Sequence, residues 1–304
     1  MKERFFFKTA FLTLVAALFL TGCQSHTEVP SIESIEVQST QETANESAKI
    51  KLSLIDAGNG ASLPISKAVD VSDWYLFVTE PGASPQEKTI VFNGTEITGK
   101  FFNRVGMEGC ATLKDFYLID DRNQGITFTV NYGSGELVGI SPYYELNAET
   151  KDSLLPLSED PLKNAEKEAR KWAEELLTNP DSYTMIPLEY VDYYYPFRFV
   201  RTVNGIETTD GVTIGISDRG GLTAYLMMDV GWVSKQEEEL KSLSTFDAEN
   251  QIREELKEYN TSLRSINNSK YGRTPNGEVV LIVDCTVRTS AGVETAAKFL
   301  ISIE

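Results

Sequence analysis

The residues that most often carry catalysis are scarce in this chain of 304 residues. His26 is its single histidine, and it lies in a polar segment shortly after Cys23. Ser-His-Asp and Cys-His catalysis, and zinc sites built on histidine, need a histidine inside a folded core. The sequence also has no glycine-rich phosphate loop and no group of metal ligands at a recognised spacing. We therefore expect no metal, no cofactor and no catalytic residue, and hence a protein that is not an enzyme.

Carboxylates are plentiful, and two of them held at a fixed separation in a cleft can hydrolyse a glycosidic bond. Asp120, Asp121 and Asp229 lie at the ends of expected strands, where catalytic acids do occur. With 45 Asp and Glu residues, neighbouring acids arise by chance, and nothing in the sequence selects one pair. A carboxylate-dependent hydrolase of cell wall or other carbohydrate is therefore kept as an alternative function.

Three cysteines are present, and Cys23 differs from Cys110 and Cys285 in its surroundings. Outside the cell the last two can form a disulfide, although a pair so distant in sequence specifies no geometry. Cysteine also serves as a small apolar core residue. We expect free, buried thiols at Cys110 and Cys285, with a disulfide between them as the alternative.

The first residues have the pattern of a secretory signal. Two lysines and an arginine form a basic start, and the apolar run Thr9–Leu20 follows. This run is shorter than the ~20 residues that span a bilayer. Its ending, Leu20-Thr21-Gly22-Cys23, resembles the lipobox of bacterial lipoproteins. The resemblance implies cleavage before Cys23, a lipid on its thiol, and anchoring on the extracytoplasmic face of the bacterial cell membrane.

The formal net charge of −17 restricts the partners of the chain. An acidic surface repels phosphate backbones and anionic headgroups, so we expect no nucleic acid and contact with the membrane through the anchor at Cys23. The same acidity keeps a secreted protein soluble. Residues 24–49 are rich in Ser, Thr, Glu and Gln, which predicts a flexible linker.

From residue 50 onward the pattern predicts strands and two helical segments. Asp160 ahead of Pro161 is typical of a helix start, and apolar residues then recur on one face as far as Leu176. A second helical segment begins at about Val233. Several strands follow each helix, which argues against a doubly wound fold. The expected strands are 74–78, 89–92, 126–130, 137–140, 190–203, 212–217, 222–229, 278–288 and 294–303.

These elements predict an α+β fold of repeated antiparallel sheets, each covered by a helix. The expected divisions are a signal peptide (1–22), the lipidated cysteine with its linker (23–49), a mainly β N-terminal region (50–150), an α+β unit (151–232) and a second α+β unit (233–304).

Two hairpins look like copies of one another, at 126–137 and 212–222. The strand Tyr195–Ile206 resembles the "aromatic-x-Arg-x-x-x-Gly-Ile" strand of PepSY-type domains in bacterial surface proteins, and 212–222 resembles their hairpin. The resemblance covers about 160–232 clearly and 245–304 weakly. It implies a small α+β unit of cystatin-like form, often repeated, without an active site and sometimes proposed to modulate peptidases.

A dense aromatic run enters one expected strand. Because side chains alternate along a strand, we expect Phe197 and Phe199 to share a face that packs beneath the helix against Trp172. The opposite face, with Tyr194 and Tyr225, is the expected contact for a partner.

Two arginines stand out in the same acidic region. Arg198 and Arg201 are suited to hold a carboxylate of a partner, such as a peptide C-terminus. Arginines of this kind more often pair with neighbouring acids on the sheet, and Glu189, Asp192 and Asp210 are near in sequence.

Together these features predict a non-catalytic, lipid-anchored surface protein. Its expected role is to bind or modulate an envelope or secreted partner, such as a peptidase or a cell-wall component. A solute-binding lipoprotein of a transporter is a further alternative, but the chain lacks the alternation of single strands and helices that its two lobes require.

Overall fold

The computed structural model describes most of the chain from residue 50 onward. The signal, Cys23 and the linker expected from the sequence lie outside the described residues, as do Asp120 and Asp121. The described residues are 50–53, 71–92, 94–119, 126–142, 160–191, 194–241 and 245–302.

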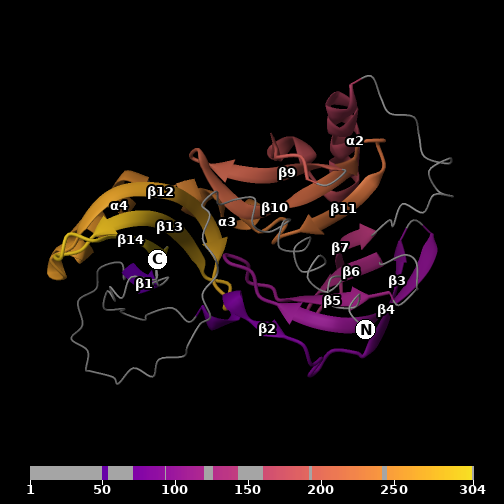
Figure 1. Ribbon diagram of the computed structural model, residues 1–304, viewed down its shortest axis with the longest axis horizontal. Helices are drawn as coiled ribbons and strands as arrows, with labels where there is room; N and C mark the ends of the chain where they lie inside the picture. Colours follow the sequence, from indigo (N-terminus) through magenta and orange to yellow (C-terminus); the bar gives the residue numbers. More distant parts are fainter. Residues whose placement is uncertain are drawn as a thin grey trace, which may run out of the picture.

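The described strands join into a single sheet (Figure 1). They are β1 (Ile50–Ser53), β2 (Phe77–Val78), β3 (Glu87–Phe92), β4 (Thr95–Val105), β5 (Lys114–Leu118), β6 (Ile126–Asn131), β7 (Leu137–Pro142), β8 (Thr184–Pro187), β9 (Tyr194–Val203), β10 (Ile206–Ser217), β11 (Leu222–Met227), β12 (Ser262–Arg273), β13 (Val279–Arg288) and β14 (Glu294–Ser302). The order along the main path is β1-β14-β13-β12-β10-β11-β7-β6-β5-β4-β2, while β3 pairs with β4, and β9 and β8 branch from β10.

Strand β10 is the place where the parts of this sheet meet. Its first residues, Glu207 and Thr208, pair in parallel with β12, whereas residues 212–216 pair antiparallel with β11. β9 pairs with both of these parts of β10. β12 and β11 therefore lie one after the other along the edge of β10 that faces away from β9. The register against β9 shifts between Glu207 and Gly211, and this irregularity separates the two lengths. In Figure 1 the strands β12, β13 and β14 lie to the left of β10, and β3 to β7 lie to its lower right.

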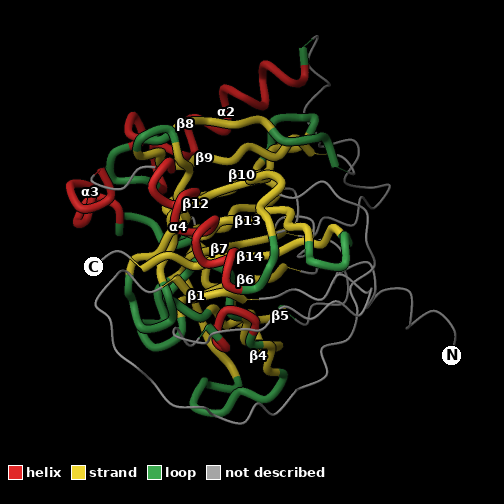
Figure 2. Tube along the Cα trace, turned by 90° about the vertical axis from the view of Figure 1, so that its left-hand side faces the viewer, coloured by secondary structure: helices red, strands yellow, loops and turns green. Residues whose placement is uncertain are grey.

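Among the described residues, three α-helices accompany the sheet (Figure 2): α2 (Pro161–Leu176), α3 (Val233–Lys241) and α4 (Thr245–Glu258). The expected start of α2 is confirmed, because the side chain of Asp160 caps the helix by accepting a hydrogen bond from the amide of Lys163 at 3.2 Å. Among the described residues, no helix has both the length and the apolar character needed to cross a membrane.

The prediction of repeated sheets, each with its own helix, is wrong. One mixed sheet includes all the described strands. Helix α2 packs against strands of the N-terminal region and of the first α+β unit, which were expected to be separate. The buried Ala165, Ala169 and Ala173 of α2 share one core cluster with residues of β5–β7 and of β9–β11. Separate sheets would each leave unpaired edges. Pairing of β7 with β11, and of β10 with β12, closes those edges and makes the sheet continuous.

The C-terminal strands are buried on both faces. Leu281 and Val283 of β13 lie in a cluster with residues of α3 and α4, while Val280 and Ile282 alternate to the other face and pack with Trp74. Burial on both faces accounts for the continuous apolar run of β13.

Trp74 belongs to a short 3-10 helix, η1 (Ser72–Tyr75), rather than to the strand expected over 74–78. The strand is reduced to β2, at one end of the sheet order. The apolar run at 74–78 therefore reflects an inserted tryptophan and a short edge strand, which periodicity alone does not distinguish from a buried strand.

Replacing Phe197 with Ala tests the core that α2 shares with both parts of the sheet. Phe197 is 0% exposed, so its truncation should lower the free energy of unfolding by about 3–5 kcal/mol in chemical denaturation. The matched control is Phe77→Ala on β2, where the ring is 55% exposed and the change should stay within about 0.5 kcal/mol. Equal losses in the two variants would contradict the shared core.

Candidate functional site

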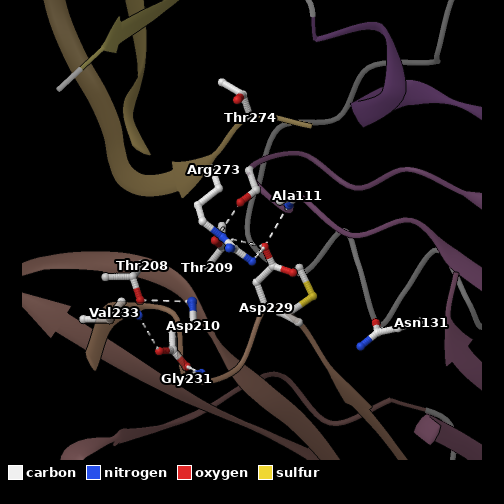
Figure 3. Close-up of polar contacts among 12 residues, drawn as sticks. Ala111, Asn131, Thr208, Thr209, Asp210, Asp229, Gly231, Val233, Arg273 and Thr274 are labelled. Atoms are coloured by element: carbon white, nitrogen blue, oxygen red, sulfur yellow. Dashed lines mark hydrogen bonds and ion pairs between the residues drawn. The ribbon is translucent and has the colours of Figure 1, made fainter. Parts of the chain in front are cut away.

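Buried charged groups gather where β10, β11 and β12 meet the loop between β4 and β5. We call residues 106–113 the junction loop, and its polar surroundings the junction. Figure 3 shows the part of the junction around Asp210 and Asp229. The side chains that define the junction are Glu108, Lys114, Thr209, Asp210, Asp229, Lys270, Arg273 and Lys298.

The backbone of Gly109 forms the centre of the junction loop. Its carbonyl oxygen accepts hydrogen bonds from Oγ1 of Thr209 at 2.7 Å and from the amide of Arg273 at 2.8 Å. Gly109 has a φ of +77°, which favours glycine, and a Cβ atom on Gly272 would lie 2.7 Å from its Cα atom. The absence of both side chains lets the junction loop and β12 touch through their backbones.

Asp229, just after β11, joins the junction loop to the end of β12. Its Oδ2 accepts hydrogen bonds from the amide of Ala111 at 2.8 Å and from Nη2 of Arg273 at 2.8 Å (Figure 3). The carbonyl oxygen of Arg273 in turn accepts from Nε1 of Trp74 at 2.9 Å. One arginine thus connects β11 with the tryptophan that covers the C-terminal strands.

Asp210 holds the start of α3 against β10. Its carboxylate accepts hydrogen bonds from the amides of Gly231 at 2.8 Å and Val233 at 3.1 Å, and from the hydroxyl of Tyr183 at 2.7 Å. Burial raises the pKa of Asp210, although these hydrogen bonds and the charge of Arg201 lower it. A carboxylate that binds the amides of a helix N-terminus stabilises that end of the helix.

Glu108 ties the junction loop to β12 and β14. Its Oε1 lies 2.8 Å from Nζ of Lys270, and its Oε2 forms an ion pair with Lys298, which also lies 3.3 Å from Asp284 of β13. Burial raises the pKa of Glu108, but the charges and hydrogen bonds of the two lysines outweigh it and lower the pKa to about 2. Glu108 is therefore ionised in the folded protein at every physiological pH.

Lys114, at the start of β5, contributes the most deeply buried amine of the junction. Its Nζ donates hydrogen bonds to Oδ1 of Asn131 at 3.0 Å and to the carbonyl oxygen of Met228 at 3.3 Å. Burial lowers the pKa of Lys114, against the nearby Cys110, Asp229 and Glu136, which raise it.

The arrangement is suited to joining segments of the chain. Asp210, Asp229 and Glu108 each accept hydrogen bonds from backbone amides, a tyrosine hydroxyl or basic side chains of other elements. Charged groups used in this way fix the relative positions of strands and loops. No cluster of metal ligands is found among the described residues.

The structure does not bring the four residues expected to contact a partner onto one face. The sheet register places Phe197, Ile214 and Tyr225 side by side on the face covered by α2, whereas Arg198 lies opposite Thr213 on the other face. Tyr194 and Tyr225 are only 3% and 4% exposed. Their rings belong to the interior of the protein.

Both arginines of that set pair with acids, as in the alternative stated from the sequence; Asp192 lies outside the described residues. Arg198 donates to both carboxylate oxygens of Glu207, at 2.8 and 2.7 Å. Arg201 forms an ion pair at 3.0 Å with Glu237 of α3.

The thiols of Cys110 and Cys285 are both free and buried, and they belong to different core clusters. Burial raises the pKa of each to about 12, so both are neutral at physiological pH. The structure therefore has the free thiols and not the disulfide.

Sequence reasoning did not find most of the junction. Glu108, Lys114 and Arg273 have no motif around them, and Asp229 was considered only as a catalytic acid. One signal was available: Lys114 lies two residues before the apolar strand residues Phe116–Leu118, and lysine is seldom buried unless it is paired.

Comparisons with known proteins give little. No family model and no curated protein matches the chain. The solved structure of the Bacillus megaterium YpeB C-terminal domain aligns over 74% of this chain and 88% of its own, with 13% identity and a TM-score of 0.32. A likeness of this strength supports no conclusion about family or function, and the PepSY resemblance of residues 195–222 stays a hypothesis.

The lowered pKa of Glu108 predicts how acid unfolds the protein. A carboxyl group whose pKa falls from 4.5 to about 2 on folding stabilises the folded state above pH 4.5, and this contribution is lost as the pH falls toward 2. The expected loss is about 3 kcal/mol of unfolding free energy. Chemical denaturation of wild type and Glu108→Gln between pH 7 and pH 2 measures it.

The variant should unfold more easily than wild type at pH 7, and the difference should shrink by about 3 kcal/mol toward pH 2. Glu238→Gln on α3 is the control, because that side chain is 90% exposed and its ion pair should contribute little. Parallel curves for wild type and Glu108→Gln would contradict the role of Glu108.

Proposed function

We propose that this chain is a non-catalytic lipoprotein, anchored through Cys23 on the outer face of a bacterial cell membrane, that binds an envelope or secreted partner. The lipobox-like ending Leu20–Cys23 supports the anchor and its location. Two classes of partner suit the resemblances in the sequence, a secreted peptidase and a component of the cell wall.

The non-catalytic part of this proposal rests on the structural hydrogen bonds that the acids of the junction accept. Asp229 and Asp210 each bind two backbone amides or basic groups and hold the sheet, the junction loop and α3 together. A general acid or base needs to reach the atom with which it exchanges a proton. Carboxylates that are already committed to structural hydrogen bonds are poor candidates for this task, which favours binding over carboxylate-dependent hydrolysis.

A surface for the partner is offered by the edge at β2. This strand is last in the sheet order. Its first residue, Phe77, is 55% exposed, and Tyr75, two residues earlier, is 49% exposed. The hydroxyl of Tyr75 donates to Oε2 of Glu108 at 2.8 Å, which holds one ring in place. An edge strand flanked by exposed aromatic rings suits an extended segment of a protein partner, which adds its backbone to the sheet and rests side chains on the rings.

Anchoring is tested by replacing Cys23 with Ala in the full chain. Loss of the lipidated thiol should move the protein from the membrane fraction to the soluble extracytoplasmic fraction when cells are separated, because the acyl chains are the expected membrane contact. A Cys110→Ala variant is the control and should stay with the membrane. Membrane association of Cys23→Ala would disprove the lipid anchor.

Partner binding is tested with the soluble Cys23→Ala protein, mixed with washed cell walls and separately with secreted proteins. We expect retention of a wall component or a peptidase, with affinity reduced at least about tenfold by Phe77→Ser if the ring is a main contact. Val91→Ser on β3 is the control, since Val91 is 62% exposed and away from that edge. Equal binding by both variants would exclude the β2 edge.

Release of sugar or peptide from the walls, abolished by one Asp or Glu substitution, would instead support the hydrolase alternative. That result would overturn the proposed function as a whole rather than the choice of surface.

A further inference from the structure

Lys114 is set apart from the other lysines of the junction by its surroundings. Its side chain is 0% exposed, and lysine is almost never fully buried unless it is paired. Lys270 and Lys298 both lie against the carboxylate of Glu108. The hydrogen bonds of Lys114 go instead to neutral oxygens, Oδ1 of Asn131 and the carbonyl of Met228.

Asn131 lies directly opposite Lys114 in the sheet. The two residues are register partners in the antiparallel pair of β5 and β6, and Lys114 also pairs with Val105 on the other side of β5. Side chains of directly opposite residues lie close enough to touch. The strand pairing therefore holds the lysine amine and the asparagine amide together for as long as the sheet is folded.

The protonation state of the amine matters for chemistry. An ammonium group donates three hydrogen bonds, whereas a neutral amine donates two and keeps a lone pair. The two neutral acceptors at Lys114 match the donors of a neutral amine. Burial, which lowers the pKa of Lys114, favours the same state, and desolvated lysines are known nucleophiles.

We propose that Lys114 and Asn131 are joined by an intramolecular amide bond that the folded protein forms by itself. The lone pair of Nζ attacks the side-chain carbonyl carbon of Asn131, a bond forms between Nζ and Cγ, and the bond between Cγ and Nδ2 breaks. Nδ2 leaves as ammonia, and it takes up the proton that Nζ gives away. The reaction needs no oxidant, reductant or other reactant, and the chain loses about 17 Da, the mass of one ammonia.

No further group is needed for this transfer, because the proton that leaves Nζ is the one that Nδ2 takes up. The fixed pairing of the two strands replaces an encounter between molecules, which is the main source of acceleration in reactions within one molecule.

Such a bond would close the loop between residues 114 and 131. A covalent closure limits the unfolded chain in the same way as a disulfide, and Cys110 and Cys285 are free. This inference does not depend on the proposed function, since it concerns the chain itself.

Mass spectrometry of the purified full chain, denatured and digested with trypsin, tests the bond. Trypsin does not cleave after an acylated lysine, so peptide 105–122 should remain whole and be joined to peptide 123–151, with a mass about 17 Da below their sum. Fragmentation should place the link between Lys114 and Asn131. The Lys114→Met variant keeps an apolar stem without an amine, and it should give peptide 123–151 at its full mass.

Location of the link is essential because other asparagines lose ammonia too. Asn-Gly pairs such as Asn204-Gly205 cyclise with the same mass change, but they join no peptides and are unaffected by Lys114→Met. The wild-type digest decides the question even if the variant fails to fold. Cleavage after Lys114 and an unmodified Asn131 in folded wild-type protein would show a hydrogen bond alone and overturn the proposal.

Discussion

Along one edge of β10, β12 pairs with the first residues and β11 with the later ones, so a single strand holds both halves of the sheet. The parallel pairing with β12 involves only Glu207 and Thr208 of β10. This ladder is too short to fix the relative positions of the two halves of the sheet by itself. The junction loop supplies what the ladder lacks. Through Gly109 it binds β10 and β12 at once, and Gly272 of β12 lies so close to Gly109 that a Cβ atom there would clash with the loop backbone.

The charged groups around this contact specify a geometry more than they add stability. Removing an ion pair such as Asp229 and Arg273 from water costs much of what their attraction returns. Their hydrogen bonds fix directions, because Asp229 and Asp210 also accept from backbone amides that an apolar side chain could not satisfy. The apolar clusters supply the driving force on either side, with Phe197 and Phe299 fully buried in separate clusters. Polar groups then decide how the two clusters are oriented.

Local features of the fold could be predicted from sequence, and long-range pairing could not. Helix α2 follows from the proline at its start and its apolar face, and the hairpins follow from alternation and glycine-rich turns. Strand β12 was missed because its sequence, SLRSINNSKYGR, is polar, and it becomes a strand only through pairing with apolar β13. The candidate site was missed for a related reason. Its members come from five segments that are distant in sequence. In the same way, the alternating pattern around Tyr225 does not indicate that α2 covers the face on which this ring lies.

The junction also determines when this protein can complete its fold. The hydrogen bond between Trp74 and Arg273 joins residues 199 apart, and the ion pair between Glu108 and Lys298 spans 190. Folds dominated by such distant contacts form slowly, since the entropy of closing long loops is lost before the contacts reward it. In a chain made from its N-terminus, the partners of Trp74 and Glu108 on β12 and β14 are absent until the last strands are available. The contacts between the junction loop and the C-terminal strands therefore form last, once nearly the whole chain is available.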